Sequence, residues 1–497
     1  MTNYNRREFL ADVGKGMLIA SVGPALAADL GISSAFADEK PKCLLFGDRE
    51  PLVALMQETP ADKLLPILVD KLKAGTDLKT LVAAGALANA RTFGGGDYDG
   101  FHNFMALMPS YQMARELPER RRSLPVLKVL YRNTSNIQGC ATEALHPVAP
   151  APLPKDRPGG EVLREATRAH DVDRAERVLA ALAKGPENEL FNQLQMTVQD
   201  EVDVHRIVLP WRAWVMLELT GKEHALTLFR QSVRHCIDQQ VEMRENHPES
   251  EIRTFLPKLL DQYRLLGRPL GKRKAEDRWV ERLADTLCHS DRPKSADAVA
   301  AGLGEGISPE DVGEAISLAA NAVMLDPAGG GHGGSDGVHI ADSVNGWRNV
   351  ARVSSARNTV ASLILAAYYK LGNAAAKQRH PLPEQLDKIK AKDAATLLRD
   401  ADAAIRDRDG GRVCALVHRY GELGHPPRPV FDLLLKYAVS EDGKLHAEKY
   451  YQAMSEEFAA TRPAFRWRHL VTLARVTASE YGTPAPGYEE ACRLLKV

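Results

Sequence analysis

Residues 308–324 read SPEDVGEAISLAANAVM, and this stretch shows which fold class to expect. Ser308 is a typical helix N-cap, Pro309 fits the first helical position, and two acidic residues follow where the helix dipole favours negative charge. The helix should end before the pair Asp326-Pro327. Similar helical periodicity fills most of the chain, and alternating β-branched runs are nearly absent. The sequence therefore predicts an all-α fold.

Further helices are predicted over Glu187–His205, Trp211–Leu219, Thr359–Lys370 and Glu384–Arg406. The segment 147–160 is rich in proline and lacks a hydrophobic period, so it is expected to be an extended connection.

Two motifs indicate an internal repeat. Asp99-Gly100-Phe101-His102 resembles Asp336-Gly337-Val338-His339, and each motif follows a glycine cluster and an alanine-rich run that contains Ala-Asn-Ala. Gly221-Lys222-Glu223-His224-Ala225 matches Gly443-Lys444-Leu445-His446-Ala447, and His205 is matched with His425.

These matches predict a tandem duplication of a multi-helix domain, over roughly residues 51–270 and 275–485, with pseudo-two-fold packing of the copies. The expected first helical half is 38–272, which includes the proline-rich linker, and the expected second half is 273–497. Chance similarity between alanine-rich helices is the alternative explanation.

The surroundings of His339 are the richest in possible ligands. Asp336, His339 and Asp342 are spaced i, i+3, i+6, with His332 upstream and Arg348 downstream. His339 and Asp342 would share a helix face, and an imidazole with a carboxylate is a normal ligand pair for Fe, Mn or Zn. An Asp N-cap with a hydrogen-bonded His is the structural alternative.

The first half repeats this pattern only in part. His102 and Asp99 are retained, but Met105 stands at the position that matches Asp342. His205 follows Glu201 at i, i+4 and is a further candidate ligand, although it can also serve as a packing residue. The hypothesis is that His102, His205, His332, His339 and Asp342 supply metal ligands, with Asp99 and Asp336 orienting the imidazoles.

Several function classes are not supported. The glycine clusters follow no strand and precede no Gly-Lys-Ser/Thr, so neither a dinucleotide fingerprint nor a P-loop is present. The six cysteines form no Cys-x-x-Cys-His haem site. Lys plus Arg equals Asp plus Glu, at 65 each, which gives no basis for nucleic-acid binding. Glu143-x-x-His146 has the spacing of di-iron bundles, but Pro147 follows directly.

The N-terminus resembles a twin-arginine export signal. Asn5-Arg6-Arg7-Glu8-Phe9-Leu10 carries the motif, a mildly apolar stretch follows, and Ala35-Phe36-Ala37 resembles a signal-peptidase site. The stretch is too short to span a membrane. The resemblance implies a removable segment over 1–37, the twin-arginine machinery as a partner, and a periplasmic or extracellular mature protein without stable membrane insertion. An ordinary amphipathic helix is the alternative.

Other resemblances are local. The helix 307–324 is similar to one in carboxymuconolactone decarboxylase-like proteins, whose paired thiols are missing here. The segment Gly337-Val338-His339 with Asn345-Gly346-Trp347-Arg348-Asn349 resembles exported helical bacterial proteins without assigned activity, and questin-oxidase-type helical proteins are similar more faintly.

Three functional hypotheses stay open. The first is a metal-dependent oxidoreductase or lyase that binds Fe, Mn, Cu or Zn and acts on a small organic molecule, with His339, Asp342 and Arg348 as catalytic groups. The second is a non-catalytic helical scaffold or ligand-binding protein. The third is a cofactor-independent enzyme that uses His339 and Arg348.

Overall fold

Helices make up the regular secondary structure of the described chain, which confirms the all-α prediction. The computed structural model describes residues 43–96, 98–138, 145–246, 251–327, 335–369, 371, 378–443 and 446–497. Within these ranges the extended pairings are isolated bridges, Arg273 to Ile307 and Glu441 to Pro484, and no strand forms. The predicted export segment lies outside the described residues.

The helices before residue 270 build one part of the fold. They are η1 (Gly47–Arg49), α2 (Glu50–Glu58), α3 (Ala61–Lys73), α4 (Leu78–Arg91), η2 (Phe93–Gly96), α5 (Tyr98–Glu116), η3 (Glu119–Arg121), α6 (Leu124–Ile137), α7 (Gly159–Arg168), α8 (Val172–Leu182), α9 (Glu187–Val198), α10 (Val204–Thr220), η5 (Lys222–His224), α11 (Ala225–Asn246) and α12 (Ile252–Gln262).

The remaining helices follow after residue 276. They are α13 (Asp277–His289), α14 (Arg292–Gly304), α15 (Pro309–Met324), α16 (Ser335–Val353), α17 (Ala356–Tyr368), α18 (Pro383–Leu386), α19 (Ala394–Arg406), α20 (Gly410–Glu422), α21 (Arg428–Ser440), α22 (His446–Ala460), α23 (Trp467–Glu480) and α24 (Tyr488–Leu495). Residues 46–497 form a single compact unit.

Two helices that the sequence predicted as continuous are each divided into two in the structure. The predicted helix 187–205 ends at Val198, and α10 begins at Val204 because Asp203 accepts hydrogen bonds from the backbone N–H groups of His205 and Arg206. The sequence-based boundary near Pro210 was wrong, since α10 continues through this proline. The predicted helix 384–406 is likewise two helices, α18 and α19, and Asp393 caps the second.

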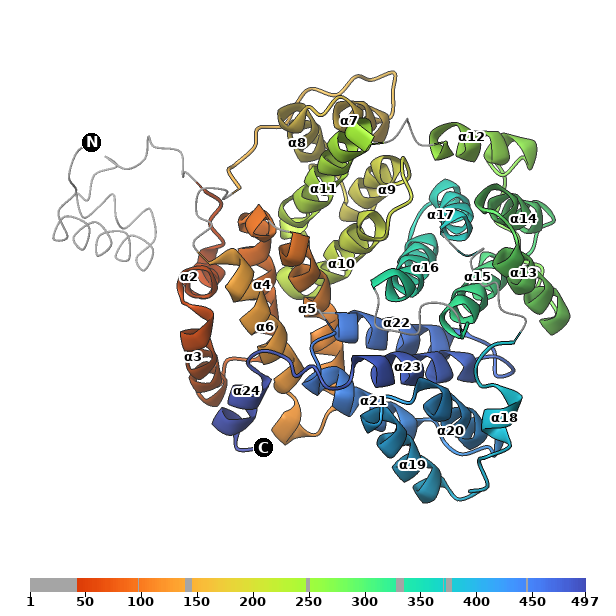
Figure 1. The fold of residues 1–497 in the computed structure, drawn as a ribbon. Helices are drawn as coiled ribbons and strands as arrows, with labels where there is room; N and C mark the ends of the chain where they lie inside the picture. The colour runs from red at the N-terminus through yellow and green to blue at the C-terminus, as the bar shows by residue number, and fades with distance from the viewer. Residues whose placement is uncertain are drawn as a thin grey trace. The chain divides into compact units, whose positions relative to one another are not determined.

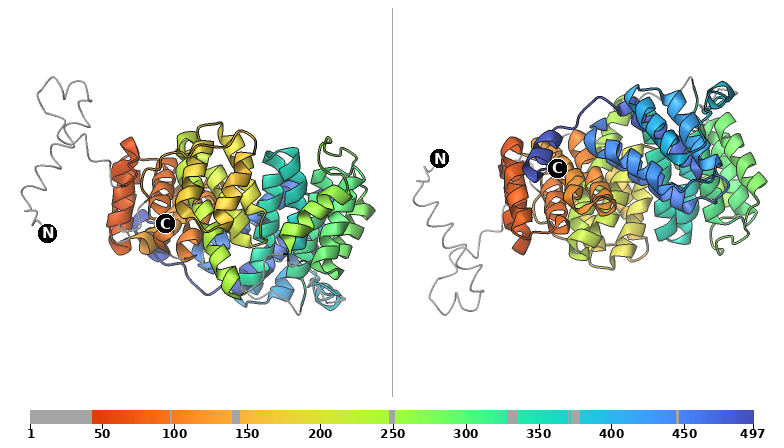
Figure 2. Two further views of the ribbon diagram at one scale, coloured as in Figure 1. Left: turned by 90° about the horizontal axis from the view of Figure 1, so that it is seen from above. Right: turned by 90° about the horizontal axis from the view of Figure 1, so that it is seen from below.

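Four helices meet at the centre of this unit. Helices α5 and α16 each pack against both α10 and α22, as Figure 1 shows in its middle region. The two views of Figure 2 place α2 and α3 at one end and α13 and α14 at the opposite end. Side chains on the inner faces of the four central helices are therefore shielded from solvent by the surrounding helices.

The surroundings of the central helices follow a similar pattern before and after residue 270. Helix α4 packs on α2, α5, α6, α10 and α11, and α15 packs on α13, α14, α16, α17 and α23. The two sets correspond except for the α4–α10 and α14–α15 contacts. The turns between α7 and α8 and between α19 and α20 are also similar. Each contains a residue with positive φ, which is His170 (59°) in the first and Arg408 (56°) in the second. The next residues, Asp171 and Asp409, each accept a hydrogen bond from the backbone N–H three positions later.

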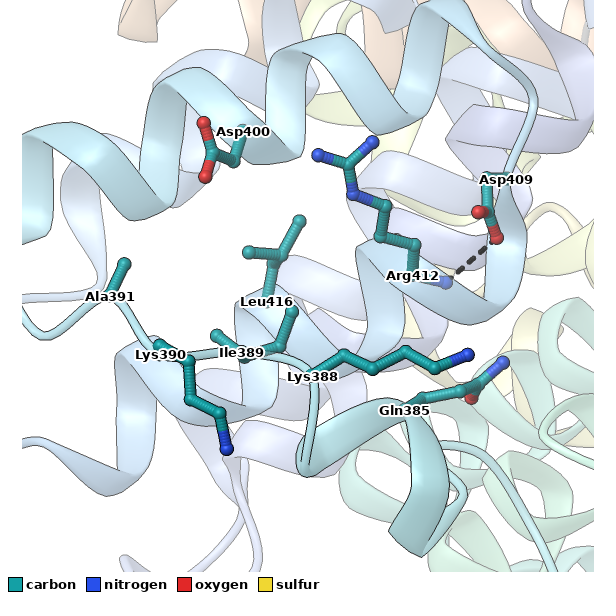
Figure 3. A pocket seen from close by; sticks show the side chains of 9 residues that line it. All are labelled: Gln385, Lys388, Ile389, Lys390, Ala391, Asp400, Asp409, Arg412 and Leu416. Atoms are coloured by element: carbon teal, nitrogen blue, oxygen red, sulfur yellow. Dashed lines mark hydrogen bonds between the residues drawn. The ribbon is translucent and has the colours of Figure 1, made fainter.

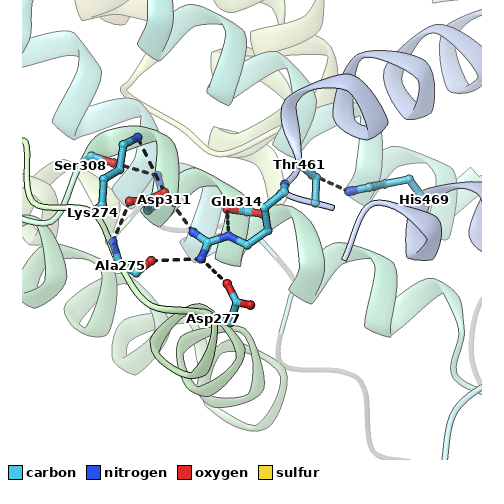
Figure 4. A network of polar contacts seen from close by, with 9 residues as sticks. Lys274, Ala275, Asp277, Ser308, Asp311, Glu314, Thr461 and His469 are labelled. Atoms are coloured by element: carbon cyan, nitrogen blue, oxygen red, sulfur yellow. Dashed lines mark hydrogen bonds and ion pairs between the residues drawn. The ribbon is translucent and has the colours of Figure 1, made fainter. Parts of the chain in front are cut away.

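Buried charged groups connect helices that are far apart in sequence. Lys128 Nζ of α6 lies 2.5 Å from Glu448 of α22 and also donates to the carbonyl oxygens of Ala438 and Glu441. Arg462 connects the segment before α23 to α13 and α15 through Asp277, Asp311, Glu314 and the Ala275 carbonyl (Figure 4). Such multiple pairing offsets the cost of taking these charges out of water.

The length and apolar character of the helices decide whether any of them could cross a membrane. None of those described combines the length and the apolar character that crossing a bilayer requires.

Candidate metal centre

Four histidines from the four central helices converge on one point. The imidazole centroids are 4.8 Å apart for His102 and His205, 5.1 Å for His205 and His339, 4.9 Å for His339 and His446, and 5.2 Å for His446 and His102. The diagonal between His102 and His339 is 6.4 Å. The four rings therefore form a closed quadrilateral, which we call the four-histidine cluster.

Each histidine of the cluster lies in the first turns of its helix. His102 and His339 are the fifth residues of α5 and α16, His205 is the second residue of α10, and His446 is the first residue of α22. His102, His205 and His446 are buried, and His339 is partly exposed. The cluster depends on contacts between distant segments, because no two of its histidines lie within one helix.

The nitrogen-to-nitrogen distances match those between ligands of one metal ion. The Nε2 atoms of His102 and His205 are 3.2 Å apart, and those of His339 and His446 are 3.0 Å apart. Two nitrogens bound to one metal at about 2.0–2.1 Å lie about 2.8–3.4 Å apart in octahedral or tetrahedral geometry. Donor atoms of His102, His339 and His446 all lie within 4.8 Å of one another. The same pairs can share a proton as N–H···N hydrogen bonds when no metal is bound.

Glycines and one asparagine position the first of these histidines. Gly94 and Gly95 have φ of 64° and 78°, which turns the chain between α4 and α5. A Cβ on Gly100 would lie 1.6 Å from the Gly94 carbonyl oxygen, so this helix start requires glycine. Asn89, from the Ala-Asn-Ala motif, donates to the Gly100 carbonyl oxygen at 2.9 Å. The corresponding glycine cluster of the second half, with His332, lies outside the described residues.

Backbone and carboxylate acceptors orient two of the rings. His446 Nδ1 donates to the Gly443 carbonyl oxygen at 3.0 Å, which leaves Nε2 of the neutral ring as an acceptor or ligand. Burial and the charge of Lys449 lower the pKa of His446 to about 2, so this ring is neutral. Asp203 lies 3.6 Å from His205 Nδ1 and 3.8 Å from His235 Nε2.

Burial opposes ionisation of Asp203, yet the adjacent imidazoles of His205 and His235 hold its pKa well below the usual value. The carboxylate is therefore a fixed negative charge behind His205. Second-sphere carboxylates of this kind commonly fix the orientation of ligating imidazoles.

Three buried charged residues lie further along the same helices. Asp342 follows His339 by three residues, Lys449 follows His446 by three, and Arg212 follows His205 by seven. These spacings repeat the face of a helix on which the histidine lies. Burial raises the pKa of Asp342 to about 6 and lowers that of Lys449 to about 8. We call Arg212, Asp342 and Lys449 the charged trio.

The remaining predicted site residues are placed elsewhere. Arg348 forms an ion pair with Glu457, two and a half turns along α16 from His339, and burial lowers its pKa to about 9. Asp342 is not among the donor atoms within 4.8 Å of one another. Asp99 is exposed, and the side chain of Asp336 lies outside the described set.

Two histidines that the sequence repeat singled out lie outside the cluster. His224 Nε2 is 3.3 Å from an Arg49 guanidinium nitrogen, and the half-buried His425 has its Nε2 2.9 Å from the Lys392 carbonyl oxygen. The match of His205 with His425 therefore does not describe the site. The cluster instead contains His446, which the sequence matched with His224 and which was not among the predicted ligands.

Two cavities lie apart from the four-histidine cluster. One of about 260 Å³ is lined by Gln385, Lys388, Asp400, Arg412 and their neighbours, with Lys388 and Arg412 extending along it in Figure 3. Another of about 400 Å³ has His380, His418, Arg379 and Arg468 in its wall. Neither cavity has a residue of the four-histidine cluster or the charged trio in its lining.

Comparison with known proteins gives no assignment: no family model, no curated protein and no solved structure matches the chain. Sequence reasoning missed His235, Lys449 and Arg212. Arg212 stands between apolar residues, and His235 and Lys449 follow the charged residues Arg234 and Glu448. None of the three belongs to a motif, so only the packing of the helices shows that it faces the centre.

Proposed function

We propose that the protein is a metal-dependent enzyme, an oxidoreductase or lyase for a small organic molecule, with its metal in the four-histidine cluster. The observation that carries the proposal is the convergence of four imidazoles from four helices, with Nε2 atoms 3.0 and 3.2 Å apart. Packing four largely buried polar rings against each other requires compensation. A shared metal ion would provide it directly for His102, His339 and His446, whose donor atoms are mutually close, and His205 contacts this group through His102.

The donor set favours particular metals. Neutral imidazole suits Zn, Cu, Fe and Ni, whereas Mn and Mg prefer oxygen ligands. No carboxylate belongs to the mutually close donor group among the described residues, since this group consists of His102, His339 and His446. We therefore expect Zn, Cu or Fe in place of Mn.

An enzyme is favoured over a purely structural metal site for two reasons. Structural zinc is usually closed by four equivalent ligands, whereas catalytic sites keep a position for substrate. Here the donor atoms of His102, His339 and His446 are close to one another. The ring of His205 contacts this group through His102. The charged trio also lies beside the cluster, and a structural metal would have no use for it.

Two further proposals concern the chain as a whole. We propose export through the twin-arginine route, on the strength of the Arg6-Arg7 motif. Retention of the protein in the cytoplasm after Arg6→Lys and Arg7→Lys substitution is the expected result, and unchanged export would contradict it.

We also propose that the two halves are duplicated copies, as the matching helix contacts and the turns at Asp171 and Asp409 suggest. In this scheme His102 corresponds to His339, and His205 corresponds to His446 instead of His425. A pseudo-two-fold axis would then pass through the four-histidine cluster.

Metal analysis tests the proposed function. The chain, purified without chelator, should contain about one transition metal ion, and substituting any one of the four histidines by Gln should lower the metal content roughly tenfold or more. His224→Gln and His425→Gln are matched controls, because sequence matching selected both histidines and both lie outside the cluster. They should leave the metal content unchanged.

A folded wild-type protein without metal, or equal metal loss in the control variants, would contradict the metal site. Metal binding without turnover of any small molecule would instead support a structural metal site and contradict the enzyme.

A further inference from the structure

The charged trio is buried, and two of its members have buried polar atoms without a hydrogen-bond partner among the described residues. Arg212, Asp342 and Lys449 are 3%, 4% and 1% exposed. Within the described part of the chain, Arg212 Nε and Asp342 Oδ1 are buried and have no hydrogen-bond partner. Glu448, the acid next to Lys449, is paired with Lys128 instead.

The trio carries an excess of positive charge. The charges of both Arg212 and Lys449 act on Asp342, so within the trio two cations share one carboxylate. Two further acids are near. Glu456 also acts on Asp342. Glu448, which is itself paired with Lys128, acts on Lys449. A metal ion in the neighbouring four-histidine cluster would add further positive charge. Uncompensated buried charge is costly, and an anion between the two cations would remove this cost.

The positions of Lys449 and Arg212 along their helices determine how far these cations lie from the four-histidine cluster. Lys449 is three residues and Arg212 seven residues beyond the histidine of its own helix, which corresponds to about 5 and 10 Å along the axis. Helix α16, which carries Asp342, packs against both α10 and α22. A ligand that touches the metal and reaches this trio is therefore one or two small rings or a short chain in length.

We propose that the charged trio is the binding site for the carboxylate group of a small organic acid, with Lys449 and Arg212 as its anchors. The inference rests on the proposed function, in that the other end of this acid would lie at the metal. Charge-assisted hydrogen bonds from an ammonium and a guanidinium to a carboxylate are about twice as strong as neutral ones. Asp342 limits the positive charge and thereby disfavours binding of di-acids.

Benzoate and benzamide are suitable probes because they have the same shape and differ in charge. Isothermal titration calorimetry of the metal-analysed protein should show benzoate binding at least about tenfold more tightly than benzamide. Lys449→Met and Arg212→Met should each weaken benzoate binding at least about tenfold, without changing the metal content. Lys436→Met, which removes an exposed lysine of α21, is the matched control.

Asp342→Asn provides a test of opposite sign. It removes negative charge from the trio and should tighten benzoate binding, so a general loss of folding cannot imitate the result. Equal affinity for benzoate and benzamide, or Lys449→Met affinity within twofold of wild type, would overturn the carboxylate site.

Metal content measured in the same samples separates the two proposals. Metal-free protein that binds benzoate through Lys449 and Arg212 would contradict the proposed metal function and support the carboxylate site. Metal-loaded protein that does not distinguish benzoate from benzamide would contradict the carboxylate site alone.

Discussion

The residues three positions after the cluster histidines differ between the two halves of the chain. In the first half they are Met105 and Val208, which are buried and apolar. In the second half they are Asp342 and Lys449, which are buried and charged. Each half thus contributes two histidines to the cluster, but the buried residues three positions later are apolar in the first half and charged in the second.

A second difference concerns the asparagine of each Ala-Asn-Ala motif. Asn89 Oδ1 accepts a hydrogen bond from Gln231 at 2.8 Å. Asn321 donates to His469 Nδ1 at 2.7 Å, and the neutral His469 therefore donates from Nε2 to Thr461. The second half again has an ionisable group where the first has a neutral one. In the proposals above, the histidines common to both halves hold the metal, whereas the carboxylate site combines Asp342 and Lys449 of the second half with Arg212 of the first.

The largest expected effect comes from adding charge to the apolar half. Val208 is 3% exposed and lies one helical turn before Arg212, so Val208→Lys buries a second cation on this face and should lower the free energy of unfolding by about 3–5 kcal/mol. Urea denaturation measures this loss. Val172→Lys, at a valine that is 38% exposed, is the matched control and should change little. Equal effects of the two substitutions would show that the apolar layer around Val208 tolerates charge.

Removing charge from the other half should have a smaller effect of opposite sign. The double variant Asp342→Met with Lys449→Val gives the second half the residues of the first, and should raise the free energy of unfolding by about 2 kcal/mol. Metal content should stay the same while benzoate binding is lost. A large loss of stability would mean that the charged pair holds the fold together, which contradicts a role in ligand binding.

The effect that is smallest at neutral pH, and grows on acidification, distinguishes the partners of the two asparagines. Burial lowers the pKa of His469 to about 3, so below the unfolded-state pKa of about 6.5 only the unfolded chain binds a proton. Stability should therefore fall as the pH drops from about 6.5 towards 3, by about 1.4 kcal/mol per pH unit from this residue. His469→Gln, which copies Gln231, should remove that part of the slope in urea titrations at pH 6, 5 and 4. Parallel curves for variant and wild type would contradict a neutral buried His469.

Sequence alone was sufficient for the fold class and for three members of the site. Helical periodicity and the Ser308 cap predicted helices, and the Asp-Gly-x-His motifs selected His102 and His339 because local glycine geometry accompanies them. His205 was selected for its acidic neighbours, although its partner proved to be Asp203, the N-cap of α10.

The rest of the site depends on contacts that sequence spacing does not encode. The match of Gly221–Ala225 with Gly443–Ala447 aligned the start of α11 with the start of α22, so His446 was paired with His224, although the first-half histidines of the cluster lie on α5 and α10. Arg348 looked like a ligand-binding group, but its partner Glu457 lies on a different helix. Lys449 and Arg212 carry no local motif, and only the packing of α10, α16 and α22 brings them together.

X-ray absorption spectroscopy at the edge of the bound metal tests the central claim most directly. The four-histidine cluster predicts a first shell dominated by nitrogen at about 2.0–2.1 Å, with the outer-shell scattering of several imidazoles. That imidazole signal should weaken in His446→Gln and persist in His425→Gln. A first shell of oxygen or sulfur without imidazole scattering, or protein that binds no metal, would contradict the account.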